Sequence, residues 1–213
     1  MTNRILSGRS AGNDGAGKGG PFADYRTTPF YPDVALYHVS GSTVQAWEYS
    51  GWKAESMSWK EGCYIHAGLS GNTPILYSGP DAEKFLSGIC VNGFARFRPG
   101  TARHAIMCDA AGLIAGHGML QRTEDDRFRL YVHGVWGNYQ FSRTNLNVTE
   151  EVLDEYLFQV AGPTSLATLE AATGTTLRDI GFLGFRQCEI AGRSVEIMRI
   201  GMAGGLAYEV HGP

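Results

Sequence analysis

Glu209, near the carboxyl end of the sequence, is the carboxylate with the most unusual surroundings. It lies between Tyr208 and Val210 in a segment whose apolar residues alternate, as they do in a half-buried β-strand. Burying a carboxylate costs several kcal/mol unless donors meet it. The donors are either structural, namely a backbone amide or Arg199 on a neighbouring strand, or they belong to a flat heterocycle whose adjacent N–H groups suit a bidentate carboxylate.

The segment around Glu209 has the pattern of a β-hairpin. Apolar residues alternate in 195–199 and again in 206–210, and the join between them contains Gly201, Gly204 and Gly205. The sequence ends at Gly212-Pro213, directly after the second strand. No helix or polar tail follows to cover this strand, and an exposed sheet edge there would be a liability, so we expect the functional unit to continue beyond the chain.

Composition excludes several classes of function. A net charge of -3 argues against nucleic acid or an anionic membrane as the main partner. The four cysteines show neither CxxC spacing nor a paired histidine cluster, so we expect no metal site and no redox motif. The sequence lacks both an apolar signal region and an apolar run of transmembrane length, and we expect a cytoplasmic protein.

Two stretches of the sequence, 75–86 and 157–169, repeat one plan. Each has an apolar strand, then Gly79-Pro80 or Gly162-Pro163, and then a helical pattern in which proline occupies the first helical position. The helices are expected to end at Gly88 and Gly174. The repeat predicts two similar modules, each with one strand and one helix before a longer β-segment.

An antiparallel meander follows each helix. The first is predicted at 104–108, 113–122 and 127–133, and the second at 184–190, 194–200 and the strand of Glu209. The predicted fold class is α+β, with two similar modules of antiparallel β-meander and helices. We assign residues 1–24 to a flexible N-terminal arm, 25–145 to the first module and 146–213 to the second, which is expected to continue beyond the chain end.

Aromatic residues crowd the stretch from 30 to 64. They are Phe30, Tyr31, Tyr37, Trp47, Tyr49, Trp52, Trp59 and Tyr64. Either they form a wall of the core, which is the preferred interpretation, or they form a face for an aromatic ligand. Within this stretch, residues 52–59 suit a short amphipathic helix that begins after Gly51.

These elements in this order resemble the folate-binding superfamily of the glycine-cleavage T-protein. The motifs that carry the resemblance are Gly79-Pro80-Asp81-Ala82, Val91-Asn92, Arg98-Pro99-Gly100, Gln159 to Pro163, and Arg199 to Gly204. The Gly-Met-Ala-Gly form at 201–204 and the lead-in at 30–32 are similar to the tetrahydrofolate-dependent aryl methyl ether O-demethylases of the vanillate and syringate type. Members of that family are longer and have a further C-terminal β domain, so we expect this chain to correspond to their first half, without that domain.

The resemblance implies transfer of a methyl group from a methoxylated aromatic compound to tetrahydrofolate, with both molecules as partners. A separate C-terminal chain or domain is a further expected partner. An aminomethyltransferase of the glycine-cleavage type is an alternative function. A non-catalytic folate-binding or assembly protein on the same scaffold is another.

The resemblance also implies which residues form the site. Tyr31 matches a tyrosine near the substrate, with a role in orientation or acid catalysis, although a phenol at the edge of the core is an equal alternative. Gln159 and Glu209 match the pterin contacts, and Asn92 is a third candidate, whose alternative is a hydrogen bond at a helix end. The resulting hypothesis is that the two modules hold one reduced pterin and that Glu209 contacts its nitrogen edge.

His117 departs from the family pattern. The T-protein pattern has aspartates at positions 115 and 116, and the demethylase pattern has an acid at 117, where this chain has Ala115, Gly116 and His117. The missing acid argues against aminomethyl transfer. A histidine here is able to act as a catalytic acid or base near neutral pH, and the alternative is a structural histidine of a strand.

Overall fold

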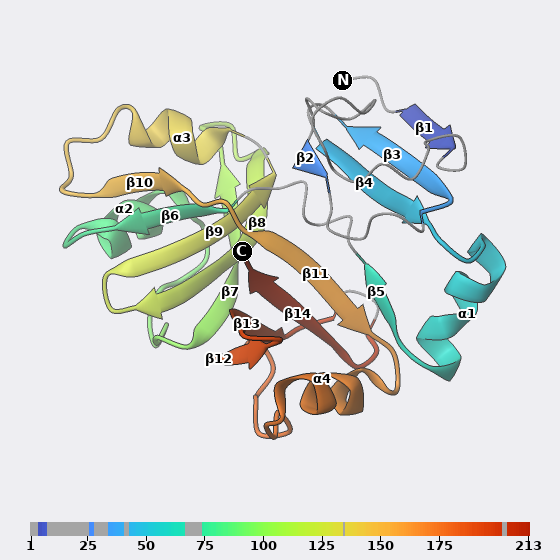
Figure 1. Ribbon diagram of the computed structural model, residues 1–213. Coiled ribbons are helices and arrows are strands. Elements are labelled where there is room, and N and C mark those ends of the chain that lie inside the picture. The colour runs from blue at the N-terminus through green and yellow to red at the C-terminus, as the bar shows by residue number, and fades with distance from the viewer. Residues whose placement is uncertain are drawn as a thin grey trace. The chain divides into compact units, whose positions relative to one another are not determined.

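A computed structural model describes residues 4–7, 26–27, 34–40, 43–66, 74–133, 135–201 and 204–213. Contacts within the backbone divide the chain into two compact units, seen in Figure 1. Unit 1 comprises Met1–Gly71, Tyr156–Asp179 and Gln187–Pro213, and unit 2 comprises Asn72–Glu155 and Ile180–Arg186. Tyr31, one of the predicted site residues, lies outside the described residues.

Unit 2 is a five-stranded antiparallel sheet with the order β10-β6-β9-β8-β7. Its elements are β6 (Ile75–Ser78), α2 (Ala82–Ile89), β7 (Thr101–Cys108), β8 (Ile114–Glu124), β9 (Arg127–His133), α3 (Trp136–Phe141) and β10 (Thr149–Val152). Strands β7, β8 and β9 form the predicted meander, so this part of the sequence interpretation is confirmed.

Unit 1 contains a second five-stranded sheet with the order β12-β13-β14-β11-β5. Its elements are β5 (Tyr64–His66), β11 (Tyr156–Ala161), α4 (Ser165–Thr173), β12 (Phe185–Ile190), β13 (Arg193–Arg199) and β14 (Ala207–Gly212), of which β12 begins in the stretch assigned to unit 2. Strands β13 and β14 pair antiparallel, which confirms the predicted hairpin.

The amino-terminal part of unit 1 forms a smaller sheet with the order β1-β3-β4-β2. Its strands are β1 (Arg4–Ser7), β2 (Arg26–Thr27), β3 (Leu36–Ser40) and β4 (Thr43–Glu48), and helix α1 (Trp52–Glu61) follows at the predicted place. Strand β1 pairs antiparallel with β3. Residues 4–7 therefore belong to a sheet, whereas the sequence predicted a flexible arm over 1–24.

The two Gly-Pro repeats have the same backbone geometry. Gly79 and Gly162 both have φ of 121°, and an added Cβ would lie 2.9 Å from the carbonyl oxygen of Asn147 at the first and 2.4 Å from that of Gly62 at the second. Helices α2 and α4 begin two residues after the prolines. Helix α4 ends at Gly174 as predicted, but α2 runs through Gly88 to Ile89.

Each five-stranded sheet takes its first strand from the other repeat. Strand β5, which precedes the first Gly-Pro unit, pairs with β11, and β10, which precedes the second, pairs with β6. When β10 is matched with β5 and β6 with β11, the strands of the two sheets follow one another in the same order. The compact units therefore differ from the modules predicted at 25–145 and 146–213, because pairing moves the amino-terminal stretch into unit 1 and residues 146–155 into unit 2.

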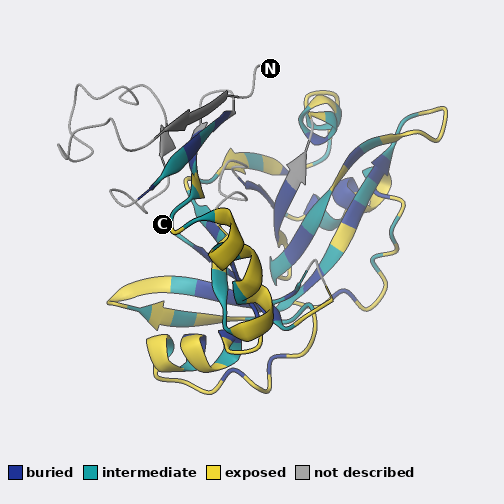
Figure 2. Cartoon of the chain, turned by 90° about the vertical axis from the view of Figure 1, so that its right-hand side faces the viewer, coloured by how far each residue is buried: buried dark blue, intermediate teal, exposed yellow. Residues whose placement is uncertain are grey.

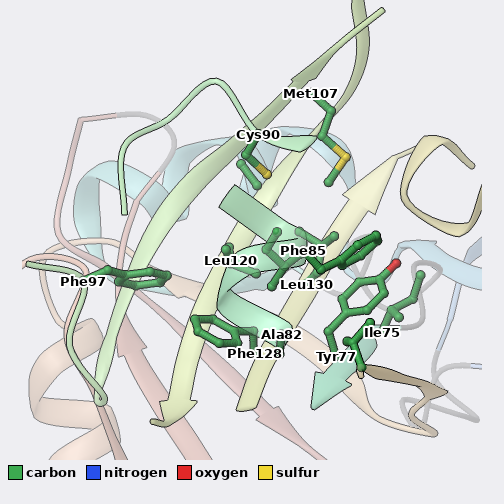
Figure 3. Close-up of a cluster of buried hydrophobic side chains, with 13 residues drawn as sticks. Ile75, Tyr77, Ala82, Phe85, Cys90, Phe97, Met107, Leu120, Phe128 and Leu130 are labelled. Atoms are coloured by element: carbon green, nitrogen blue, oxygen red, sulfur yellow. The ribbon is translucent and has the colours of Figure 1, made fainter. Parts of the chain in front are cut away.

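The core of unit 2 lies between α2 and its sheet. Helix α2 places Ala82, Phe85, Leu86 and Ile89 on one face at helical spacing, and the first three are buried. Figure 3 shows Phe85 against Leu120 and Leu130 of the sheet. This packing holds β6 and the meander in one register.

Strand β14 is a central strand and not an exposed edge. It lies between β13 and β11 and forms antiparallel ladders with both. Its second partner comes from the Gly-Pro repeat some fifty residues upstream, and local alternation contains no signal for that pairing.

The predicted core wall of aromatic residues is only partly present. Tyr37 is buried, but Trp47, Trp52 and Trp59 are 56, 71 and 60% exposed. Helix α1 has no buried residue, and exposed residues run along it in Figure 2, where it faces the viewer. These indoles do not contribute to the core of unit 1.

Candidate functional site

The candidate site lies on one face of the large sheet of unit 1. The register places Gln159 directly opposite Glu209, His66 on the other side of Gln159, and Met198 on the other side of Glu209. Residues directly opposite each other share a sheet face, so these four side chains form one row. The two residues that sequence reasoning assigned to a pterin are therefore neighbours.

Glu209 is 5% exposed and Gln159 6%, which confirms the expected burial of the acid. The Nε2 atom of His211, two residues further along β14, lies 3.5 Å from the Glu209 Oε2. His211 is itself only 1% exposed and lies opposite a second buried carboxylate, Glu196, which accepts a 3.1 Å hydrogen bond from Gln187 Nε2. Glu209, His211 and Glu196 therefore form a buried polar cluster on this face of the sheet.

The structural alternative for Glu209 that involved Arg199 is wrong. Arg199 pairs with Tyr208 in the register, whereas Met198 pairs with Glu209. Successive residues of a strand point to opposite faces, so Arg199 and Glu209 start from opposite faces of the sheet. Sequence reasoning missed His211 and Glu196, although the period of 2 and the hairpin register together place both on the face of Glu209.

Gln159 has a buried amide nitrogen that forms no hydrogen bond with any described residue. Leaving a buried donor unsatisfied costs about 1–3 kcal/mol. Among the described residues, this face therefore presents an unsatisfied donor, Gln159 Nε2, beside the Glu209 carboxylate, which is an acceptor. A planar heterocycle with both N–H groups and an acceptor on one edge matches this set.

The equivalent positions of unit 2 carry side chains of a different kind, and the polar one pairs within the unit. Leu76 and Arg129 occupy the places of Gln159 and Glu209 in the matching strands, and they lie opposite each other in the same way. Arg129 Nη1 lies 3.4 Å from Glu155 Oε2, and the hydroxyl of Tyr131 donates to the same oxygen at 3.2 Å. The polar face with a free donor is thus a property of the second repeat.

The glycine-rich join before β14 permits a close backbone approach. A Cβ added at Gly201 would lie 2.9 Å from the Ala207 Cβ and 2.9 Å from the carbonyl oxygen of Gly205. Contacts this short require glycine. Gly201 thereby lies close to Gly205 and to Ala207, at the start of the strand that carries Glu209.

Asn92, in unit 2, has a structural contact. Its Oδ1 accepts a 2.8 Å hydrogen bond from the backbone N–H of Ile106 in β7. The residue follows the end of α2, and the contact resembles the structural alternative that the sequence left open. The oxygen of this amide already has a protein donor.

His117, also in unit 2, is exposed on β8 and pairs with a second histidine. Its Nε2 lies 3.1 Å from the Nδ1 of His104 on β7. The ring centroids are 5.3 Å apart with an angle of 21° between the planes, so the two rings are nearly parallel. The pair shares one hydrogen bond, and His104 was not singled out from the sequence because it lies thirteen positions away.

His66 makes the stability of the fold depend on pH. Part of its ring reaches solvent, but burial of the remainder lowers the pKa of His66 below its usual value of 6.5. The unfolded chain then binds a proton more readily than the folded one, so the free energy of unfolding falls as pH drops through 6.5. We expect His66→Gln to flatten this dependence in urea titrations from pH 8 to pH 5. Parent and variant profiles that remain parallel would refute the assignment.

Two absences concern the described part of the chain only. It contains no group of three or more histidine, cysteine or acidic side chains placed to hold a metal ion. None of its helices combines the length and apolar character needed to cross a membrane.

The chain is similar to proteins of a known family. Residues 13–213 match the family described as GCVT N-terminal domain. A sesamin methylene transferase from Sinomonas sp. (strain No.22) is 43% identical over 169 residues, which cover 78% of this chain and 37% of that protein. A syringate O-demethylase from Sphingobium sp. (strain NBRC 103272 / SYK-6) is 30% identical, over 78% of this chain and 39% of that protein.

The fold is shared with a solved structure. The glycine cleavage system aminomethyltransferase T from Bartonella henselae superposes with a TM-score of 0.73 at 21% identity, covering 88% of this chain and 54% of that one. The chain therefore spans well under two thirds of the length of each of these three proteins.

Proposed function

This chain belongs to the GCVT N-terminal domain family, and from that premise we propose that the protein moves a methyl group from a methoxylated aromatic compound to tetrahydrofolate. The two relatives named as a methylene transferase and an O-demethylase support one-carbon transfer from an aromatic compound. The cytoplasm is the proposed location.

The observation that carries the proposal is the pairing of Glu209 with Gln159. A reduced pterin has two adjacent N–H donors and a carbonyl acceptor along one edge of a planar ring. The buried Glu209 carboxylate fits the donors, and the unsatisfied Gln159 Nε2 fits an acceptor. The residues present therefore suit this group, and its polar edge would satisfy the amide that the protein leaves without a partner.

Bound tetrahydrofolate supplies a secondary amine that is able to accept the methyl group. The protein has to supply a proton or hydrogen bond to the ether oxygen, because a phenolate is a poor leaving group. Such assistance contributes typically 10²- to 10⁴-fold to a rate. We propose Tyr31 and His117 for this role, with His104 holding the His117 ring through their 3.1 Å contact.

Aminomethyl transfer is the weaker candidate. Ala115 and Gly116 occupy the positions of the aspartate pair of the T-protein pattern, and Ala203 and Gly205 replace polar residues of the aminomethyltransferase motif. The likeness to the aminomethyltransferase structure is at 21% identity and concerns the fold alone.

A turnover assay tests the proposal. The intact protein is incubated with tetrahydrofolate and a panel of methoxyarenes and methylenedioxyarenes that includes vanillate. We expect 5-methyltetrahydrofolate and the matching catechol from at least one methoxyarene. Folate binding without turnover across the panel would identify a binding protein instead, and formation of methylenetetrahydrofolate from an aminomethyl donor would identify an aminomethyltransferase.

A further inference from the structure

A groove on unit 1 is formed by aromatic side chains that the proposed function does not use. It has a volume of about 640 Å³ and lies between the end of β4, helix α1 and the start of β5. Trp47 comes from β4, Trp52 and Trp59 from α1, and Tyr64 from β5. Its volume is in the range of about 300–1,000 Å³ that is usual for small-molecule sites.

The helix presents one face to this groove. Trp52, Glu55 and Trp59 have spacings of three and four residues, which place them in one stripe of an α-helix. In a core helix this stripe would be buried, as it is in α2. Here the three indoles of the groove, including Trp47, remain more than half exposed. Large exposed apolar surfaces of this kind mark binding sites more often than isolated exposed residues do.

The charges of the groove have one sign. Glu48 and Glu55 line it, and none of its lining residues is basic. The Glu55 Oε1 accepts hydrogen bonds of 2.6 Å from the backbone N–H groups of Tyr49 and Ser50, which fixes this carboxylate at the start of the helix. No described residue forms an ion pair with the Glu48 carboxylate.

We propose that this groove binds an organic cation of the quaternary ammonium class. The faces of indole and phenol rings carry partial negative charge and attract such cations. The two carboxylates add to that attraction, whereas they would repel a benzoate and give an uncharged arene no advantage. The site differs from that of Glu209 and Gln159, and its ligand does not depend on the proposed methyl transfer.

The test compares choline with its uncharged carbon isostere, 3,3-dimethylbutan-1-ol, by calorimetry on the intact protein. We expect choline to bind about 10-fold more tightly, since only the cation gains from the ring faces and carboxylates. Trp59→Leu and Glu48→Gln should each weaken choline binding by about 2- to 5-fold. Phe182→Leu, an exposed ring outside the groove, and Glu61→Gln, an acid of α1 that does not line it, should leave the affinity unchanged.

Three results would overturn the proposal. One is equal or absent binding of choline and its isostere. Another is choline binding that persists unchanged in the Trp59→Leu, Glu48→Gln double variant, which would place the cation elsewhere. The third is tighter binding of 1,2-dimethoxybenzene than of choline at this groove, which would make it an aryl site. These experiments measure choline binding, whereas the proposed function is tested by methyl transfer. A negative result in either experiment therefore does not decide the other.

Discussion

Replacing Glu209 by glutamine is expected to weaken tetrahydrofolate binding by roughly 1.5–3 kcal/mol, or about 10- to 150-fold in Kd. The carboxylate is 5% exposed and lies beside the unsatisfied amide of Gln159. A neutral amide keeps its size but accepts more weakly from two N–H groups, and its own NH₂ opposes one of them. Calorimetric titration of the intact protein with tetrahydrofolate measures the change.

The matched control is Glu150→Gln in unit 2. Glu150 is a strand carboxylate too, although it is only partly buried, and it accepts a 2.6 Å hydrogen bond from the hydroxyl of Tyr77. We expect its replacement to change folate affinity by less than about 2-fold, because that carboxylate already accepts a hydrogen bond within its own unit.

Gln159→Leu should have a smaller effect than Glu209→Gln, near 0.5–1.5 kcal/mol for a neutral hydrogen bond. Unchanged affinity in a folded Glu209→Gln variant would show that Glu209 has a structural role and does not bind folate.

Gly162→Ala is expected to lower the free energy of unfolding by about 3 kcal/mol or more. Gly162 has φ of 121°, a conformation that residues with a Cβ rarely adopt. The added methyl group would also lie 2.4 Å from the carbonyl oxygen of Gly62 and 2.9 Å from the Cα of Cys63, and both are backbone atoms that cannot turn away. Chemical denaturation of the intact protein gives the change.

Alanine variants of two other glycines distinguish the effect of the positive φ from the effect of the close backbone contacts. Gly79 has the same φ of 121°, but its nearest backbone atom, the Asn147 oxygen, would lie 2.9 Å from the new Cβ, so its alanine variant should lose less stability. Gly174 has φ of 67° with nothing within 4 Å, and its alanine variant should cost only about 1–2 kcal/mol. Equal losses at all three positions would show that backbone conformation dominates and that the close approach of Gly162 to Gly62 and Cys63 is unimportant.

Much of the local structure was predictable. Alternation around 195–199 and 206–210 predicted the hairpin, and it placed a buried acid at Glu209 within it. The Gly-Pro pattern predicted a strand followed by a helix in both repeats, although each helix begins two residues after its proline and not at it. The amphipathic pattern after Gly51 likewise predicted α1.

The exposure of α1 could not be predicted in the same way. An amphipathic stripe says which face of a helix is apolar, but it does not say whether another element covers that face. The same kind of stripe is buried in α2, where the sheet of unit 2 lies against it, and open in α1, where Trp52 and Trp59 line a groove. The difference depends on packing partners far away in the sequence.

By itself the sequence determined the type of the main strands and helices of the two repeats, because these depend on backbone conformation and on patterns within one segment. A resemblance in its motifs indicated the family and the candidate site residues. Only the tertiary structure decided that β14 is central, that β5 and β10 exchange between the repeats, and that Gln159 lies opposite Glu209 beside His211. Strand order and register result from pairing between segments that are far apart in the chain. A shift of one residue would turn every side chain of β14 to the other face, and no alternation within β14 alone reveals which register is formed.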